Sequence, residues 1–223
     1  MKISQQAFTL SEVLITLGII GIVAALTIPN IMTKYYEKRT VNQLKETQSI
    51  IAQAIRMSED EYGDASSWTT EYWSKKGAED IAEKLKYSLK IATDCGVSDS
   101  KNSCIQKTYL RRNGQNHDIN YATDTRYYKI VLLNGTAVWW KATDQNERLS
   151  GTYIEFFVDT NGVTPPNTWG KDLFVFSYEN GGIRPFGAPD SHYPYKTHCI
   201  PQDSTGYGCA FWVLTTQNMS YLH

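Results

Sequence analysis

The sequence predicts an α+β protein in which a long N-terminal helix packs against a C-terminal antiparallel β-sheet. Residues 13–32 form an uncharged apolar run that continues into a helix-forming pattern ending near Tyr62. After Lys107, short apolar runs alternate with clusters of Gly, Asn, Asp and Thr, which is typical of strands joined by turns. A length of 223 residues suffices for one folded head and an extension, so we expect a single head domain.

The apolar run VLITLGIIGIVAALTIPNIM, residues 13–32, is long enough for a membrane-spanning helix. As a helix it would extend roughly 30 Å, which equals the thickness of the hydrocarbon core of a bilayer. It follows a short N-terminal stretch, MKISQQA, which carries Lys2 and no acid. An ordinary secretory signal has a shorter apolar core followed by an A-x-A cleavage site, so we expect this run to stay in the mature protein.

Glu12 places a carboxylate one turn inside this otherwise apolar helix. A buried and unpaired charge is costly in a membrane, so an intramembrane carboxylate indicates a functional role and a partner. The alternative is that Glu12 lies at the headgroup boundary and is solvated, because the uncharged run begins only at Val13. The residues on both sides of Glu12 favour the functional role.

The segment AFTLSEVLITLGIIGIVAALTIPNI, residues 7–31, resembles the N-terminal processing and assembly signal of type IV pilins and type II secretion pseudopilins. The resemblance implies that a prepilin peptidase cleaves between Ala7 and Phe8 and that the new amino terminus of Phe8 is methylated. Glu12 then becomes the fifth residue of the mature chain, which is the position of the family's glutamate. Ala7 departs from the Gly that is usual in the family, and we expect the cleavage site to tolerate this small residue.

The same resemblance implies an assembly role for Glu12. In filaments of this family the apolar helices bundle, and the glutamate is thought to meet the N-terminal ammonium of a neighbouring subunit, here Phe8. Pairing offsets the desolvation of both charges, and it fixes the axial register because a shift of one turn would leave both charges unpaired. Pro29 matches a proline of the family and is expected to kink or locally melt the helix.

The resemblance implies a pilin-like fold with four parts. Residues 1–7 would be the leader peptide, 8–32 the transmembrane and assembly helix, 33–62 its amphipathic continuation and 63–223 the globular head. Within the continuation, apolar residues recur at three- and four-residue steps, so this part of the helix should pack against the head. A free coiled coil is the alternative, but too few heptads have apolar a and d positions.

Within the head we expect a break after the long helix, a second helix from Ala78 to Leu89, and then an antiparallel sheet. Asn134 and Gly135 predict a tight hairpin between the first two strands. The expected strands are Tyr127–Leu133, Thr136–Lys141, Thr152–Val158, Leu173–Tyr178 and Ala210–Leu214.

The four cysteines fall into two close pairs, Cys95 with Cys104 and Cys199 with Cys209. The residues between the members of each pair are rich in Gly, Ser, Asp and Asn, which can turn the chain back, so we expect a disulfide within each pair. Free or metal-bound thiols are the alternative, although His198 beside one pair is too little evidence for a zinc site. Disulfides would indicate an oxidising, extracytoplasmic compartment.

The segment DTNGVTPPNTWGKD, residues 159–172, is a candidate calcium site. Asp159, Asn161 and Asp172 supply oxygen ligands of the type that calcium prefers, and some pseudopilins bind calcium in a comparable loop. The spacing is not that of an EF-hand, because Val163 occupies the fifth position and has no side-chain oxygen. We favour the alternative, a turn in which the Asp and Asn side chains bond to their own backbone.

Composition and motifs exclude several function classes. A formal net charge of −1 provides no basic field, so we expect no nucleic-acid binding. No G-x-S-x-G, H-E-x-x-H or phosphate-binding Gly loop accompanies the four histidines, so we expect surface histidines and no enzyme. The aromatic residues Trp139, Trp140, Tyr193 and Tyr195 are able to bind a glycan or a partner, but sheet aromatics are more often core residues, and we assign them no ligand.

We therefore expect a structural subunit that polymerises through its N-terminal helix into a type IV pilus or a type II secretion pseudopilus. Before assembly it would cross a bacterial inner membrane once, with its head outside the cytoplasm. The expected partners are like subunits and other pilins or pseudopilins, the prepilin peptidase and the inner-membrane assembly platform. The alternative is a single-pass, membrane-anchored extracytoplasmic module that binds calcium or a glycan and does not form the filament body.

Overall fold

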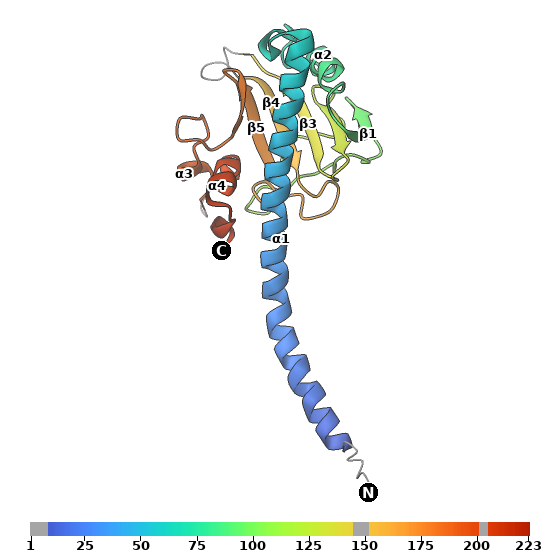
Figure 1. Ribbon diagram of the computed structural model, residues 1–223, viewed down its shortest axis with the longest axis vertical. Helices are drawn as coiled ribbons and strands as arrows, with labels where there is room; N and C mark the ends of the chain where they lie inside the picture. Colours follow the sequence, from blue (N-terminus) through green and yellow to red (C-terminus); the bar gives the residue numbers. More distant parts are fainter. Residues whose placement is uncertain (1–8, 145–151, 201–204) are drawn as a thin grey trace, which may run out of the picture. The chain divides into compact units, whose positions relative to one another are not determined.

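The computed structural model describes residues 9–144, 152–200 and 205–223, and the structural statements below concern these residues. The chain divides into two compact units, Met1–Arg39 and Thr40–His223, which we call the N-terminal and C-terminal units. Helix α1, Leu10–Tyr62, begins in the first unit and ends in the second. All other described helices and strands belong to the C-terminal unit (Figure 1).

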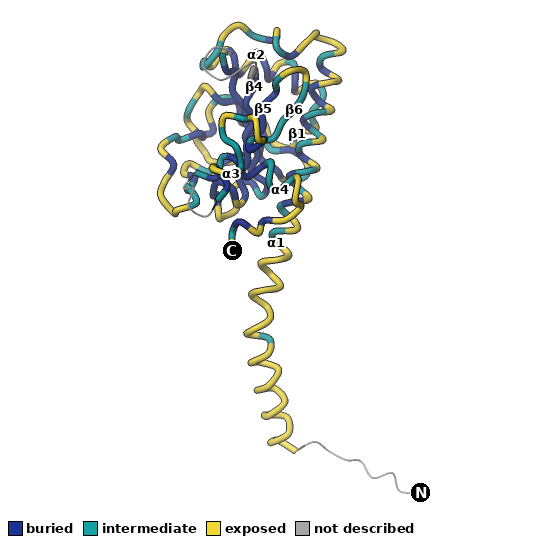
Figure 2. The backbone as a smooth tube through the Cα atoms, turned by 90° about the vertical axis from the view of Figure 1, so that its left-hand side faces the viewer, coloured by how far each residue is buried: buried dark blue, intermediate teal, exposed yellow. Residues whose placement is uncertain are grey.

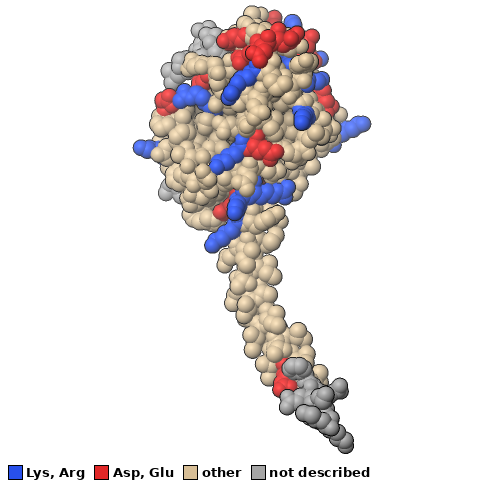
Figure 3. All heavy atoms as spheres, in the orientation of Figure 1, with Lys and Arg blue, Asp and Glu red and all other residues tan. Residues whose placement is uncertain are grey.

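The predicted long N-terminal helix is confirmed by α1, which is continuous from Leu10 to Tyr62. Pro29 lies inside the helix, so local melting, one of the two effects expected of this proline, does not occur. By length and composition, α1 is apolar enough to cross a membrane. Its large apolar side chains up to Met32 are all exposed. In Figure 3 this stretch shows acidic atoms only near its N-terminal end, where Glu12 lies in the first turn of α1.

The second half of α1 has one buried face. Figure 2 shows burial beginning where α1 enters the C-terminal unit. The buried side chains recur at three- and four-residue steps, as expected for a helix with one face against a core. They are Val41, Leu44, Thr47, Ile51, Ala54, Ile55 and Ser58. The predicted amphipathic pattern of this segment therefore corresponds to real packing, and Figure 1 shows α1 running across the sheet.

The sheet has six antiparallel strands in the order of the sequence, β1 to β6. Its central hairpin turns at Asn134 and Gly135, as the sequence predicts. Gly135 has a φ of 84°, and its N–H donates to the carbonyl of Leu132 at 2.9 Å. The strands are β1 (Ile91–Gly96), β2 (Tyr128–Leu132), β3 (Ala137–Ala142), β4 (Thr152–Asp159), β5 (Leu173–Glu179) and β6 (Gly182–Pro185).

Alternate residues of the central strands enter two different cores. On β3, Trp140 belongs to the core that includes Leu44 and Ile51 of α1, whereas Trp139 belongs to a second core on the opposite face. This second face is covered by loops, and its core includes Phe157 and Trp169. Trp139 and Trp140 are both fully buried, so the interpretation of these sheet aromatics as core residues is confirmed.

One expected strand is a helix. Residues Ala210–Leu214 lie within α4, Cys209–Thr216, which ends at Gln217 in the left-handed conformation. A short apolar run without polar alternation fits a buried strand or a buried helix equally well, and here the helix begins directly after Gly208. The periodicity of this segment was therefore insufficient to assign it.

Three further elements differ from expectation. The edge strands β1 and β6 were not predicted, because β1 exposes polar residues and β6 is only four residues long. Helix α2 spans Lys75–Leu85, earlier than the predicted range, because Ser74 caps it and accepts a hydrogen bond from the N–H of Gly77. Short helices complete the fold: α3 at Tyr195–His198 and single 3₁₀ turns at Ala65–Ser67 and Ser220–Leu222.

We predict that Leu44→Ala lowers the free energy of unfolding by about 2 to 5 kcal/mol, because it leaves a cavity between α1 and the sheet. Leu44 is 0% exposed. Denaturant unfolding of the full chain in detergent, followed by tryptophan fluorescence, measures the change. Met57→Ala is the matched control, since Met57 lies on the same helix and is 55% exposed. Equal losses in the two variants would contradict this packing.

Candidate functional site

The N-terminus of α1 carries a capping box formed by Thr9 and Glu12. One carboxylate oxygen of Glu12 accepts hydrogen bonds from the N–H and the hydroxyl of Thr9, both at 2.8 Å. The N–H of Glu12 donates to the Thr9 hydroxyl at 3.3 Å. Glu12 therefore satisfies a main-chain donor that the first turn of a helix leaves without a partner. Ala7 and Phe8, the predicted processing residues, lie outside the described residues.

The capping role of Glu12 was readable in the sequence and was missed. Ser or Thr followed three residues later by Glu, directly before an apolar run, is the signature of a capping box. Thr9 and Glu12 meet this pattern. Glu12 was interpreted through its charge alone, in the membrane, at the headgroup boundary or in filament assembly, and Thr9 was assigned no role.

The threonine hydroxyls in the rest of the apolar segment bond to main-chain carbonyls of the same helix. The hydroxyl of Thr16 donates to the carbonyl of Val13, and that of Thr27 to the carbonyl of Val23, both at 2.9 Å. This bonding suits a helix in surroundings without water. At Gly18 and Gly21, an added Cβ would meet nothing within 4 Å, so the backbone is open there to another helix.

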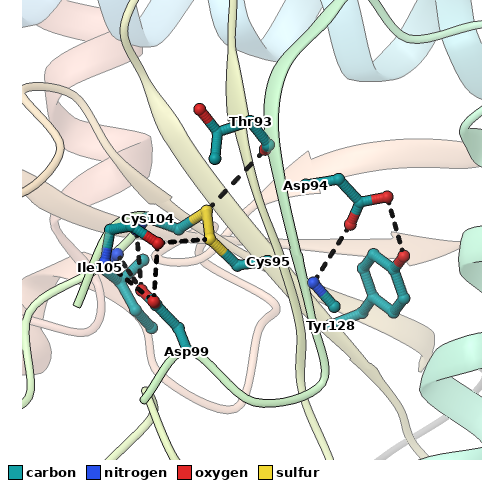
Figure 4. Close-up of a disulfide and its surroundings, with 9 residues drawn as sticks. Thr93, Asp94, Cys95, Asp99, Cys104, Ile105 and Tyr128 are labelled. Atoms are coloured by element: carbon teal, nitrogen blue, oxygen red, sulfur yellow. Dashed lines mark hydrogen bonds between the residues drawn. A yellow bond between two sulfur atoms is a disulfide. The ribbon is translucent and has the colours of Figure 1, made fainter. Parts of the chain in front are cut away.

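The structure contains both expected disulfides, Cys95–Cys104 and Cys199–Cys209. The first joins β1 to the loop that follows it (Figure 4). The second joins the end of α3 to the start of α4. No cysteine is free, so free or metal-bound thiols, the alternative interpretation, do not occur in the part of the chain that the structure describes.

Asp99 organises the loop closed by the first disulfide. One of its carboxylate oxygens accepts from the N–H and the hydroxyl of Ser103, and the other accepts from the N–H groups of Cys104 and Ile105 (Figure 4). Burial alone would raise the pKa of Asp99, but these donors together lower it below the ordinary value. Its carboxylate lies within 4.8 Å of both sulfurs, yet the disulfide removes them as metal ligands.

The candidate calcium loop brings Asp159 and Asp172 together in the core. Asp159 accepts from the Tyr109 hydroxyl at 2.8 Å and from the N–H of Asn161 at 3.2 Å. Asp172 accepts from the N–H groups of Asn167 and Thr168, at 2.7 and 2.6 Å. This is the backbone-bonded turn that we favoured from the sequence, and calcium binding by the loop stays a prediction.

The two carboxyl groups are electrostatically strained as a pair. Burial, followed by the nearby charge of Asp172, raises the pKa of Asp159 well above its ordinary value. Burial also raises the pKa of Asp172 to about 6, against the lowering effect of its main-chain donors. A cation would relieve this strain only by displacing or sharing the hydrogen bonds described above.

Comparison with known protein families separates the N-terminal segment from the rest. Residues 30–198 match a family of unknown function (DUF6613), and this match covers more than half of the chain. The chain belongs to this family. Residues 2–28 of this DUF6613 member match the prokaryotic N-terminal methylation motif, which confirms the signal shared by type IV pilins and pseudopilins. No curated protein and no solved structure shows a significant match.

The methylation motif identifies a pilin-like substrate of prepilin peptidase. The apolar helix and the motif together are consistent with a membrane-anchored protein. The family that residues 30–198 match has no known function, so this match assigns no activity to the chain.

We predict that acidification from about pH 8 to about pH 5 stabilises the fold through Asp159 and Asp172. Because their folded-state pKa values are raised, the folded chain holds protons that the unfolded chain releases. This stabilisation is fully present below the ordinary value of 3.8 and is lost as the pH rises through about 6 for Asp172. Denaturant unfolding of the full chain in EDTA measures it, and Asp159→Asn should reduce the pH dependence.

The exposed Asp60 supplies the control, Asp60→Asn, which should leave the pH dependence unchanged. Burial lowers the pKa of His117, so protonation of His117 destabilises the fold on acidification. This contribution is the same in wild type and Asp159→Asn, and it cancels when their free energies of unfolding are subtracted at each pH. If the free energy of unfolding depended on pH in the same way in wild type and Asp159→Asn, the predicted stabilisation through Asp159 and Asp172 would be contradicted. In buffer without EDTA at pH 8, added calcium chloride should raise the Tm of wild type and Asp60→Asn, but not of Asp159→Asn, if the loop binds calcium. No rise in any of the three would contradict calcium binding by this loop.

Proposed function

We propose that this chain is a non-enzymatic filament subunit, polymerised through the first half of α1 into a type IV pilus or a type II secretion pseudopilus. The observation that carries the proposal is the methylation motif at residues 2–28, because type IV pilins and pseudopilins, which share this signal, are structural subunits of filaments. Cleavage between Ala7 and Phe8 would release the mature chain. Like subunits, other pilins and the inner-membrane assembly platform are the proposed partners.

The exposed apolar surface of α1 supports this proposal. Residues 10–32 present large apolar side chains on every side of the helix, such as Leu14 at 61% and Ile22 at 65% exposed. Such a surface needs a nonaqueous environment. A bacterial inner membrane would supply it before assembly, and the helices of other subunits would supply it afterwards.

Glu12 supports the proposal through its accessible carboxylate. It is held in place by Thr9, and the ammonium group created at Phe8 of a neighbouring subunit could pair with it. In a bundle without water, such a pair would be strongly favoured over two separate charges. The capping bonds would reduce the rotamer freedom lost when the pair forms.

The disulfides support an extracytoplasmic C-terminal unit. Two disulfides in the C-terminal unit are typical of proteins that fold in an oxidising compartment. We therefore place this unit outside the cytoplasm, with α1 crossing the inner membrane once.

Intact-mass analysis of the chain extracted from its native membrane tests processing and compartment together. We expect a chain that begins at methylated Phe8 and gains four hydrogens when its two disulfides are reduced. Ala7→Gly should be processed at least as completely, and Ala7→Leu should accumulate as precursor, because only a small residue enters the cleavage site. An uncut wild-type chain with four free thiols would contradict both processing and location.

Three variants separate the charge of Glu12 from its capping role. Glu12→Ala should still insert and be cleaved, but it should fail to enter filaments because the Phe8 ammonium loses its partner. Glu12→Gln keeps a capping side chain without the charge and should fail as well. Thr9→Ala keeps the charge of Glu12 and removes the bonds between its side chain and Glu12, so its filament incorporation should fall less than that of the two Glu12 variants. Filament incorporation is measured in sheared fractions, and Glu46→Ala, at an exposed site on the same helix, is the control.

Normal assembly of Glu12→Gln together with failure of Thr9→Ala would show that capping, and not charge pairing, is the role of Glu12.

A further inference from the structure

A pocket lies on the face of the sheet opposite α1. Its volume is about 80 Å³, several times the roughly 10 to 15 Å³ that one water requires. Its floor is buried and its rim, formed by loops, is partly exposed. Floor residues are Tyr121, Tyr127, Lys141, Glu155, Phe157, Trp169 and Val175, and rim residues are Ile119, Phe186, Tyr193 and Tyr207.

An ion pair forms part of the floor. Lys141 of β3 and Glu155 of β4 are cross-strand neighbours whose charged atoms lie 3.0 Å apart. Their side chains are 5% and 2% exposed. The Lys141 ammonium also lies 3.6 Å from the ring centre of Trp73. The pair makes the floor polar but formally neutral, and a charged ligand would have to compete with one of its members.

Unused hydrogen-bonding groups surround this pair. Within the described residues, the hydroxyls of Tyr121 and Tyr127 make no hydrogen bond, although both residues are only 2% exposed. The indole N–H of Trp169 is buried and has no acceptor among these residues. The Trp169 N–H has no surface that a water-sized molecule can reach, so it does not contact a ligand. The two tyrosine hydroxyls belong to residues that line the pocket, and because buried polar groups are normally satisfied, they indicate that a polar molecule completes them.

The walls of the pocket are aromatic. Tyr207 and Trp169 meet edge to face with ring centres 4.3 Å apart, and Tyr193 lies 5.3 Å from Tyr207. His117, which we expected at the surface, is buried and its Nε2 lies 2.7 Å from the Tyr207 hydroxyl. Tyr207 is therefore held in position at the rim. Flat rings of this kind offer apolar faces beside polar tips.

We propose that this pocket binds one neutral sugar residue, such as the end of a glycan. A sugar ring offers hydroxyls to Tyr121, Tyr127 and the ion pair, and apolar C–H faces to the aromatic walls. A cation would have to compete with Lys141 for Glu155, and an anion with Glu155 for Lys141, whereas an apolar ligand would leave the tyrosine hydroxyls without partners. The proposal adds a ligand to the filament subunit and does not depend on assembly.

Saturation-transfer NMR on the full chain tests the proposal, with the protein in a detergent that contains no sugar, such as lauryldimethylamine oxide. The probes are the methyl glycosides of glucose, galactose, mannose and N-acetylglucosamine. We expect at least one probe to bind saturably with a Kd on the order of 1 mM. A methyl glycoside has about a dozen heavy atoms, and a binding free energy of about −0.3 kcal/mol per atom gives this affinity. The anionic methyl glucuronide should bind at least about fivefold more weakly than methyl glucoside.

Tyr127→Phe is the decisive variant, because it removes one hydroxyl that has no partner in the fold and should leave stability intact. We expect it to weaken binding by about fivefold to tenfold. Tyr87→Phe is the control, since Tyr87 is 73% exposed and does not line the pocket. Failure of all four neutral probes to bind, equal affinity in Tyr127→Phe and wild type, or tighter binding of the glucuronide would each overturn the proposal.

Discussion

The fold depends on one helix that must suit two environments. From Val13 to Met32, α1 exposes large apolar side chains on all sides, whereas from Val41 only one face is buried. That buried face supplies Leu44 and Ile51 to the core on one side of the sheet. Because a six-stranded sheet needs an apolar cover on at least one face, the second half of α1 fixes which side chains of each strand point toward it.

The opposite face of the sheet is built on a different principle. Loops cover it in place of a helix, and loops need internal restraints to hold a core. Asp99 and the disulfide Cys95–Cys104 restrain one loop, and Asp172 restrains another by binding main-chain N–H groups. Such a cover leaves room for the polar and aromatic pocket, which a continuous apolar helix face would have filled.

Sequence reasoning succeeded where a pattern was long or repeated and failed where tertiary context decided. The uncharged run, the central strands and the Asn134–Gly135 hairpin carry strong local signals, and all were found. Strand β1 was missed because two register shifts and exposed polar residues hide its alternation. At the N-terminal site, Glu12 could be identified from the sequence because it is a charge beside an apolar run. The pocket could not be predicted, because its residues Tyr121, Trp169 and Tyr207 come from loops far apart in the sequence.

The order of the strands has a consequence for biogenesis. Every strand of the sheet pairs only with its neighbours in sequence, from β1 to β6. From β2 onward these contacts close short connections, although residues 97–127 separate β1 from β2, and short connections favour rapid folding. A chain delivered from its N-terminus can therefore add each new strand to an existing edge as it emerges. Partly synthesised chains would then expose one growing edge at a time, which limits the surface open to misassociation with other nascent chains.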